Sequence, residues 1–255
     1  MKVPFVSLAR EADSIKEQLI SKTEEILSSG IYIQSQNLRS FESSFALTCK
    51  TDFAIGVGNG SDALTFILRA LNIGPGDEVI CPANSFIASA WAIVASGAKP
   101  VFCDVEDNLL ISKNSVSKSI TKRTKALIAV HLTGSMCNMT ELKTYCDNRN
   151  IFLLEDAAQA ILANSPSGPP GTLSVAASYS LHPLKNLGVY GDGGVITSNS
   201  KDIASFVTLL RNHGLENRDT SVIWGFNSRL DELQAAYASI KLKYIDSWTN
   251  KYIDI

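Results

Sequence analysis

The sequence lacks long hydrophobic runs and a strong charge of one sign. None of its 255 residues lies in a stretch that approaches the ~20 apolar residues of a membrane span, and MKVPFVSLAREAD at the start has no apolar core for a signal peptide. Lysine and arginine total 23 and aspartate and glutamate total 25, so the net charge is −2. That balance gives no electrostatic reason to expect nucleic acid or an acidic membrane as a partner. We therefore expect a cytoplasmic protein with no nucleic-acid and no membrane partner.

Cysteine and histidine are sparse and scattered, which argues against disulfides and metal sites. The five cysteines form an odd set without a C-x-x-C pair, and several lie in apolar runs where a buried free thiol is the ordinary outcome: Cys49, Cys81, Cys103, Cys137 and Cys146. We infer a reducing compartment. The histidines show no close ligand spacing, and they are His131, His182 and His213. We predict no metal, although His131 ends an apolar run at the sheet edge where Asp156 is also expected.

What the sequence does contain is a regular alternation of short apolar runs and helical stretches. With 45% apolar residues the chain has enough material for a large core, and we expect one large domain over residues 1–255. The expected strands hardly alternate, which is typical of a sheet buried on both faces, and they lie near 53–57, 78–82, 99–105, 126–132, 151–157, 177–181 and 193–198. No helical pattern separates the last two, so one of them should run antiparallel. The pattern predicts an α/β fold with a mostly parallel seven-stranded sheet, one antiparallel strand and helices on both faces.

Apolar periodicity predicts where several helices begin and end. One helix is expected over 14–29 with Gly30 as its stop, and another starts near Ser61 and has a left-handed end at Gly74. A single long helix is expected from Arg229 through Trp248.

The segment GVGNGSDAL, residues 56–64, is a glycine-rich turn between a strand and a helix. Free N–H groups and the positive helix end at such a turn can hold a phosphate. The spacing does not fit G-x-G-x-x-G because position 61 is serine, and no G-x-x-x-x-G-K-[ST] occurs. Two interpretations stay open here: a phosphate site at Gly60 and Ser61, or a tight turn in which Ser61 is a local cap.

Two further residues lie where strands give way to polar segments. Asp156 follows a buried strand at the carboxyl edge of the sheet, where open α/β folds place ligands, but it would equally serve as a helix N-cap. Lys185 lies in the glycine-rich connection YSLHPLKNLGVYGDGG. Most lysines are solvated surface residues, whereas a partly desolvated lysine has a free amine that attacks carbonyls.

These features fit one ligand that has a phosphate, a ring nitrogen that must stay protonated and an aldehyde. Pyridoxal 5'-phosphate has all three. Gly60 and Ser61 would hold its phosphate, Asp156 the pyridinium proton, and Lys185 would form the Schiff base. Phe86, in the polar loop after the strand at 78–82, would stack on the ring.

Seven motifs occur in the order found in one known family: GSDAL, GPGDEVICP, GAKPVFCDV, EDAAQA, SLHPLKNLGVYGDGG, RNHG and GFNSRLDELQAA. The chain resembles the sugar aminotransferases of the DegT/DnrJ/EryC1/StrS group, within the fold type I pyridoxal-phosphate enzymes. The resemblance implies the large domain of that fold and a transfer of an amino group, from glutamate, to a keto-sugar attached to a nucleotide diphosphate. It also implies a homodimer with shared active sites and a role in polysaccharide or small-molecule glycosylation pathways.

The resemblance assigns roles residue by residue. The roles given above recur in it: Gly60 and Ser61 form the phosphate turn, and Phe86 stacks on the ring. Asp156 is the partner of the ring nitrogen, and Lys185 is the Schiff-base lysine. The resemblance adds the following: Gln159 lies near the ring hydroxyl, Ser180 is a second phosphate ligand, and Asn227 reaches the phosphate of the neighbouring subunit. Arg229 lies close to these residues but equally suits a salt bridge at a helix start.

The resemblance also leaves alternatives open. Family members usually continue into a smaller C-terminal domain that covers the active-site cleft, and we expect this chain to contain only the start of the helix that leads to it. The chain is then either an aminotransferase or a catalytically impaired cofactor-binding fragment or regulatory module. A pyridoxal-phosphate-dependent sugar dehydratase is disfavoured, because such members carry histidine where this chain has Lys185.

Overall fold

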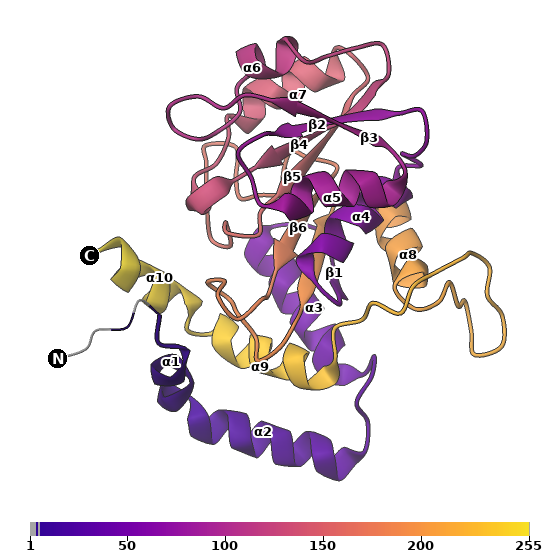
Figure 1. Ribbon diagram of the computed structural model, residues 1–255. Helices are drawn as coiled ribbons and strands as arrows, with labels where there is room; N and C mark the ends of the chain where they lie inside the picture. Colours follow the sequence, from indigo (N-terminus) through magenta and orange to yellow (C-terminus); the bar gives the residue numbers. More distant parts are fainter. Residues whose placement is uncertain (1–3, 5, 255) are drawn as a thin grey trace.

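A computed structural model of the chain describes residue 4 and residues 6–254 (Figure 1). The parts of the expected domain at residues 1–3, 5 and 255 lie outside the described residues. At the centre is a seven-stranded sheet with the order β1-β7-β6-β5-β4-β2-β3. Its strands are β1 (Phe53–Val57), β2 (Glu78–Pro82), β3 (Lys99–Cys103), β4 (Thr124–Val130), β5 (Phe152–Asp156), β6 (Ala176–Ser180) and β7 (Gly194–Ser198).

The strand directions confirm the predicted topology. Strand β7 pairs antiparallel with both β1 and β6, and the other neighbouring pairs in the sheet are parallel. A parallel neighbour of β6 would need a long crossover, and the connection from β6 to β7 contains no helix. The sequence therefore predicts correctly that one of the last two strands reverses direction.

Helices surround the sheet (Figure 1). Their bounds are α1 (Leu8–Ser14), α2 (Lys16–Ser29), α3 (Gln36–Cys49), α4 (Gly60–Ala70), α5 (Ile87–Ser96), α6 (Lys113–Ser117), α7 (Met139–Asp147), α8 (Lys201–Leu210), α9 (Glu232–Leu242) and α10 (Ile245–Ile253). A short 3₁₀ helix, Leu132–Gly134, follows β4.

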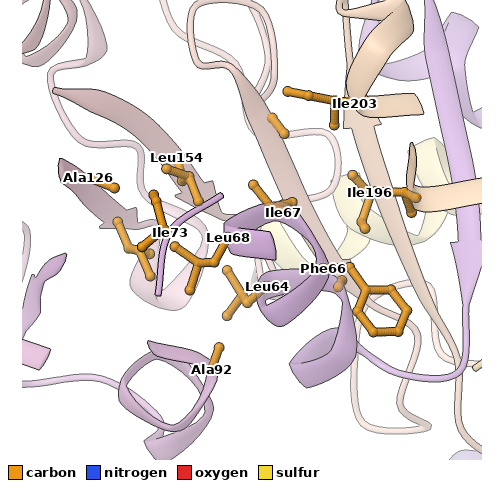
Figure 2. Packing of buried hydrophobic residues seen from close by; sticks show 14 of the residues in the cluster. Leu64, Phe66, Ile67, Leu68, Ile73, Ala92, Ala126, Leu154, Ile196 and Ile203 are labelled. Carbon is orange, nitrogen blue, oxygen red and sulfur yellow. The ribbon is translucent and has the colours of Figure 1, made fainter. Parts of the chain in front are cut away.

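Both faces of the sheet are buried under these helices. Along β4, Ala126 and Ile128 belong to a core with α4, α5 and α8, whereas Leu127 and Ala129 belong to a core with α6 and α7. A third core joins α3 and α9 to β6 and β7. Figure 2 shows the side chains of α4 lying between strand residues such as Leu154 and the neighbouring helix α5. Each large side chain buried in this way stabilises the fold by roughly 1.5–3 kcal/mol.

In the N-terminal half of the chain, the structure differs from the predicted helices at two places. Gly30 ends α2 with φ 67° as predicted, but the expected helix over 14–29 is broken at Ile15, which is buried and leaves the helical region at φ −129°. After α4 the left-handed residue is Asn72, at φ 54°, and not Gly74. Asparagine tolerates this conformation, so the glycine was not needed for it.

The expected single helix from Arg229 is two helices, α9 and α10. Helix α9 starts only at Glu232, whose buried carboxylate accepts the backbone N–H of Asn37 at 2.9 Å and so caps the start of α3. It ends in a tight turn in which the Tyr244 N–H donates to the Lys241 carbonyl at 2.9 Å. These tertiary contacts override a periodicity that continues through both helices.

Two expectations about the chain as a whole can be compared with the structure. All five cysteines are free and buried, as predicted. Over the described residues, no helix combines the length and the apolar character that crossing a membrane would require.

Candidate active site

Several strand ends meet at one edge of the sheet. Gly194, the first residue of β7, pairs with Val57 at the end of β1 and with Ser180 at the end of β6. Asp156 ends β5, which lies beside β6. Because β7 is antiparallel, its start lies level with the ends of its neighbours. The GVGNGSDAL turn, Asp156 and the connection that holds Lys185 therefore leave the sheet at the same edge.

The turn after β1 presents two open backbone amides. Asn59 is the N-cap of α4, and its Oδ1 accepts the Asp62 N–H at 2.8 Å, so the cap is Asn59 and not Ser61. Within the described part of the chain, the N–H groups of Gly60 and Ser61 have no acceptor. A Cβ on Gly60 would lie 2.9 Å from the Cβ of Ser180, so the two residues are in contact. Open amides at the positive end of an 11-residue helix, beside a serine, suit a phosphate.

Ser228 fixes this turn from a distant part of the chain. Its buried Oγ accepts the Gly58 N–H at 2.9 Å and donates to Asp62 Oδ2 at 2.6 Å. Asn59 Nδ2 donates to the same Asp62 oxygen at 3.0 Å. Sequence reasoning did not identify Ser228, because its partners lie up to 170 positions away. The network holds the backbone so that the two open amides keep one direction.

Gly194 is equally necessary for the turn. A Cβ there would lie 2.4 Å from the carbonyl carbon and oxygen of Asn59, a backbone contact that cannot relax cheaply. We predict that Gly194→Ala lowers the free energy of unfolding by about 1–3 kcal/mol and weakens binding of inorganic phosphate or pyridoxal 5'-phosphate. Gly74→Ala is the matched control, since its Cβ would meet only Ser96 O at 3.4 Å. Equal urea midpoints and equal phosphate affinity for the two variants would contradict this.

Asp156 is held as a buried, oriented carboxylate. Its Oδ1 accepts the Ala158 N–H at 3.2 Å, and its Oδ2 accepts the hydroxyl of Ser89 at 2.7 Å. The segment after Asp156 forms turns and not a helix, so Asp156 is not a helix N-cap. Nor does it orient a histidine, because the buried His131 Nε2 lies 2.7 Å from Glu155 Oε2 instead. Among the residues that the structure describes, no group of three His, Cys, Asp or Glu side chains is arranged to hold a metal ion.

Lys185 is half-buried in the connection between β6 and β7. Burial lowers the pKa of its amine, and the negative charge of Asp156 opposes that shift. The backbone around it is fixed: the Lys185 N–H donates to the His182 carbonyl at 2.8 Å, and the buried Lys241 donates to the carbonyl of Gly188. The amine is thus partly desolvated, interacts with the Asp156 carboxylate, and is carried by an ordered loop.

The lowered pKa of Lys185 has a measurable consequence. At a given pH a larger share of its amine is neutral, so in the cofactor-free chain it should be acylated with a midpoint below the ~10.4 of free lysine. Asp156→Asn should lower the pKa of Lys185 further, because the Asp156 charge raises it. Competitive labelling from pH 6 to 11, read by peptide mass spectrometry, gives both midpoints. A midpoint at or above that of free lysine would contradict the burial seen here.

Three other predicted residues are exposed near this edge. Phe86 is the N-cap of α5 and is 73% exposed, and Gln159 lies in the turn after Asp156. Asn227 is also exposed, and none of the hydrogen bonds among the described residues uses its side chain. Arg229 donates to Asn212 Oδ1 at 3.0 Å, and not to an acidic partner at a helix start. The structure brings Gly60, Ser61, Ser180, Asp156 and Lys185 to one edge; the ring contacts of Phe86 and Gln159 stay predictions.

These residues fit pyridoxal 5'-phosphate. Two unpartnered amides suit its phosphate, a buried carboxylate suits a protonated ring nitrogen, and a desolvated amine suits its aldehyde. Residues 13–255 match the DegT/DnrJ/EryC1/StrS aminotransferase family. The chain belongs to this family. The predicted family and fold are therefore confirmed.

Two curated relatives and a cofactor-bound crystal structure are similar to this chain. The chain is 40% identical over 251 residues to a dTDP-3-amino-3,4,6-trideoxy-alpha-D-glucose transaminase of Streptomyces venezuelae, covering 98% of this chain and 66% of that protein. It is 38% identical over 252 residues to a pleiotropic regulatory protein of Geobacillus stearothermophilus, covering 98% and 68%. The crystal structure of NtdA from Bacillus subtilis with bound cofactor PMP is 31% identical, has a TM-score of 0.90, and is matched over 96% of this chain and 56% of that one. The predicted vitamin B6 cofactor is confirmed, and the chain spans about two thirds of the length of the two curated relatives.

Proposed function

We propose that the chain is the cofactor-binding domain of an aminotransferase that moves an amino group from glutamate to the keto group of a nucleotide-linked deoxysugar. One observation carries this proposal: open amides, a buried carboxylate and a desolvated lysine converge at one sheet edge. The transaminase from Streptomyces venezuelae supports the nucleotide-sugar substrate. Membership in the family supports the amino transfer.

Each residue of the site has a role in this reaction. The N–H groups of Gly60 and Ser61, with the Ser180 hydroxyl, bind the phosphate at the positive end of α4. Asp156 keeps a proton on the ring nitrogen, and when bound the cofactor supplies an electron sink for the carbon that loses its proton. Lys185 Nζ would hold the cofactor through its aldehyde carbon, with release of water, and after the amino donor has taken its place the lysine would carry a proton to and from the substrate carbon. The lowered pKa of Lys185 supplies the neutral amine for both tasks.

A homodimer completes the proposed site. The connection between α8 and α9 extends away from the body of the molecule (Figure 1). It carries Trp224, which is 97% exposed, and then Asn227. An aromatic side chain presented in this way is typical of a protein interface. We infer that this segment docks on a second copy of the chain, where Asn227 reaches the phosphate of the bound cofactor.

The protein is proposed to work in the cytoplasm. Its five free thiols support this, because a reducing compartment keeps cysteines unpaired.

The function is tested with the chain loaded with pyridoxal 5'-phosphate. Adding L-glutamate should release about one 2-oxoglutarate per bound cofactor, because the cofactor takes the amine and no acceptor is yet present. A dTDP-linked keto-deoxysugar added next should gain nitrogen, detected by mass spectrometry, and D-glutamate serves as the control donor. Loss of a hydroxyl from the sugar without gain of nitrogen would identify a dehydratase instead.

A regulatory module is the second candidate, and the Geobacillus relative described as a regulatory protein favours it. The same experiment separates the two functions. A module that only binds the cofactor would hold it on Lys185 but release no 2-oxoglutarate.

A further inference from the structure

Two hydrogen-bonded serines, the half-buried Ser85 and the buried Ser89, lead from the start of α5 to the Asp156 carboxylate. Ser89 is 1% exposed, and its Oγ lies 2.7 Å from Asp156 Oδ2 and 2.8 Å from the Oγ of Ser85. An ionised carboxylate only accepts hydrogen bonds, so Ser89 must donate its single hydroxyl proton to Asp156. Ser85 then donates to Ser89. Asp156, the acceptor at the end, therefore fixes which group donates in both of these hydrogen bonds.

We propose that Ser89, supported by Ser85, is a positioning residue that holds the Asp156 carboxylate in one orientation toward the cofactor ring nitrogen. This inference rests on the proposed function for its catalytic consequence. Ser89 and the Ala158 N–H each occupy one lone pair on a different oxygen of Asp156. The carboxylate plane is thereby set, and each oxygen keeps a further lone pair for another donor.

Burial makes these donors necessary. Asp156 is only 7% exposed, so water cannot readily replace a hydrogen-bond donor that its carboxylate loses. The start of the ten-residue helix α5, where Ser89 lies, also places a positive helix end beside the carboxylate.

The same turn of α5 also sets the position of Phe86. The Ser89 N–H donates to the Phe86 carbonyl at 3.1 Å, and Phe86 lies between Ser85 and Ser89 in the chain. One turn therefore fixes the residue expected on the ring face and the carboxylate expected at the ring nitrogen. A shift of this turn would displace both contacts together.

The test compares Ser89→Ala with Ser89→Thr, which keeps the hydroxyl, and with Ser96→Ala, which removes a hydroxyl at the far end of the same helix. In the cofactor-free chain, the carbon NMR chemical shift of the Asp156 carboxylate, which reports the hydrogen bonds that it accepts, should change in Ser89→Ala but not in Ser89→Thr or Ser96→Ala. In the loaded chain, the nitrogen NMR shift of ring-labelled pyridoxal 5'-phosphate should move toward the neutral pyridine value in Ser89→Ala. The rate of 2-oxoglutarate release should fall about tenfold, the loss expected from one hydrogen bond to a charged group. Ser85→Ala should show the same changes at smaller size.

The outcomes divide cleanly. If Ser89→Ala leaves both the carbon NMR shift of the Asp156 carboxylate and the ring-nitrogen shift unchanged, the inference is wrong even if stability falls. Equal losses in Ser89→Thr and Ser89→Ala would also overturn it, because they would indicate packing and not the hydroxyl. Failure of the parent chain to bind pyridoxal 5'-phosphate would refute the proposed function, while the Asp156 carboxylate shift in the cofactor-free chain would still decide the role of Ser89.

Discussion

Lys185→Ala should retain the fold but abolish covalent attachment of pyridoxal 5'-phosphate and reduce amino transfer by about 1,000-fold or more. The loop holds its shape through backbone bonds such as Val189 N–H to the Leu181 carbonyl at 2.8 Å, which do not need the lysine side chain. The variant therefore loses the nucleophile and the proton carrier without losing the site. Borohydride reduction followed by mass spectrometry reads the attachment, and release of 2-oxoglutarate reads the transfer.

Lys125→Ala is the matched control, because Lys125 is an exposed lysine on β4. It should keep both the adduct and the activity. An adduct that survives in Lys185→Ala, on any other lysine and with parent-like activity, would refute the assignment.

Lys185→Ala also tests the proposed shared site when it is mixed with Asn227→Ala. In a mixed dimer one site carries both defects, whereas the other has an intact Lys185 and receives an intact Asn227 from the partner. Unfolding and refolding the two inactive variants together should thus restore activity, approaching one quarter of the parent value when chains pair at random. Restoration confined to the sum of the separate variants would mean that Asn227 acts within its own chain.

Asp156→Asn should lower the rate of 2-oxoglutarate release by about 100- to 1,000-fold, while cofactor attachment to Lys185 persists. The amide keeps the size of the side chain but removes the negative charge that stabilises a protonated ring nitrogen. The nitrogen NMR shift of ring-labelled cofactor should then report a neutral pyridine. This change acts on the chemistry of the ring and leaves the phosphate contacts at Gly60 and Ser61 unaffected.

Asp52→Asn makes the same chemical change at an exposed position and serves as the control. If Asp156→Asn released 2-oxoglutarate as fast as this control, the carboxylate would have no part in the reaction. If it failed to bind the cofactor at all, its role would be structural.

The parts of the site that the sequence predicts are those with a local signal. Asp156 follows an apolar strand, Lys185 lies in a glycine-rich connection, and Gly60 and Ser61 lie in a turn between a strand and a helix. Each signal is contained within one short segment of the chain, and the resemblance to a known family adds the roles of Ser180, Gln159 and Asn227. The helix cap at Asn59 was missed because the hydroxyl of Ser61, two positions later, is by sequence alone as good a capping group as the amide oxygen of Asn59.

The supporting residues could not be found in this way. Ser228 reaches the phosphate turn from 170 positions away, and Ser89 reaches Asp156 across 67 positions. Serines are common at helix starts and in loops, so neither position differs from many others until the chain is folded. The break between α9 and α10 is a similar case, since the apolar periodicity continues through it.

The sequence by itself determined the succession of strands along the chain and the reversal of one strand, and it supplied the candidate reactive groups, because hydrophobic period, turn chemistry and motifs are local properties. Only the tertiary structure decided which hydroxyls hold the carboxylate, which glycine lets two loops touch, and how far the lysine is removed from water. Those properties depend on contacts between segments distant in the chain, whose distances and burial arise only when the sheet brings its strand ends together.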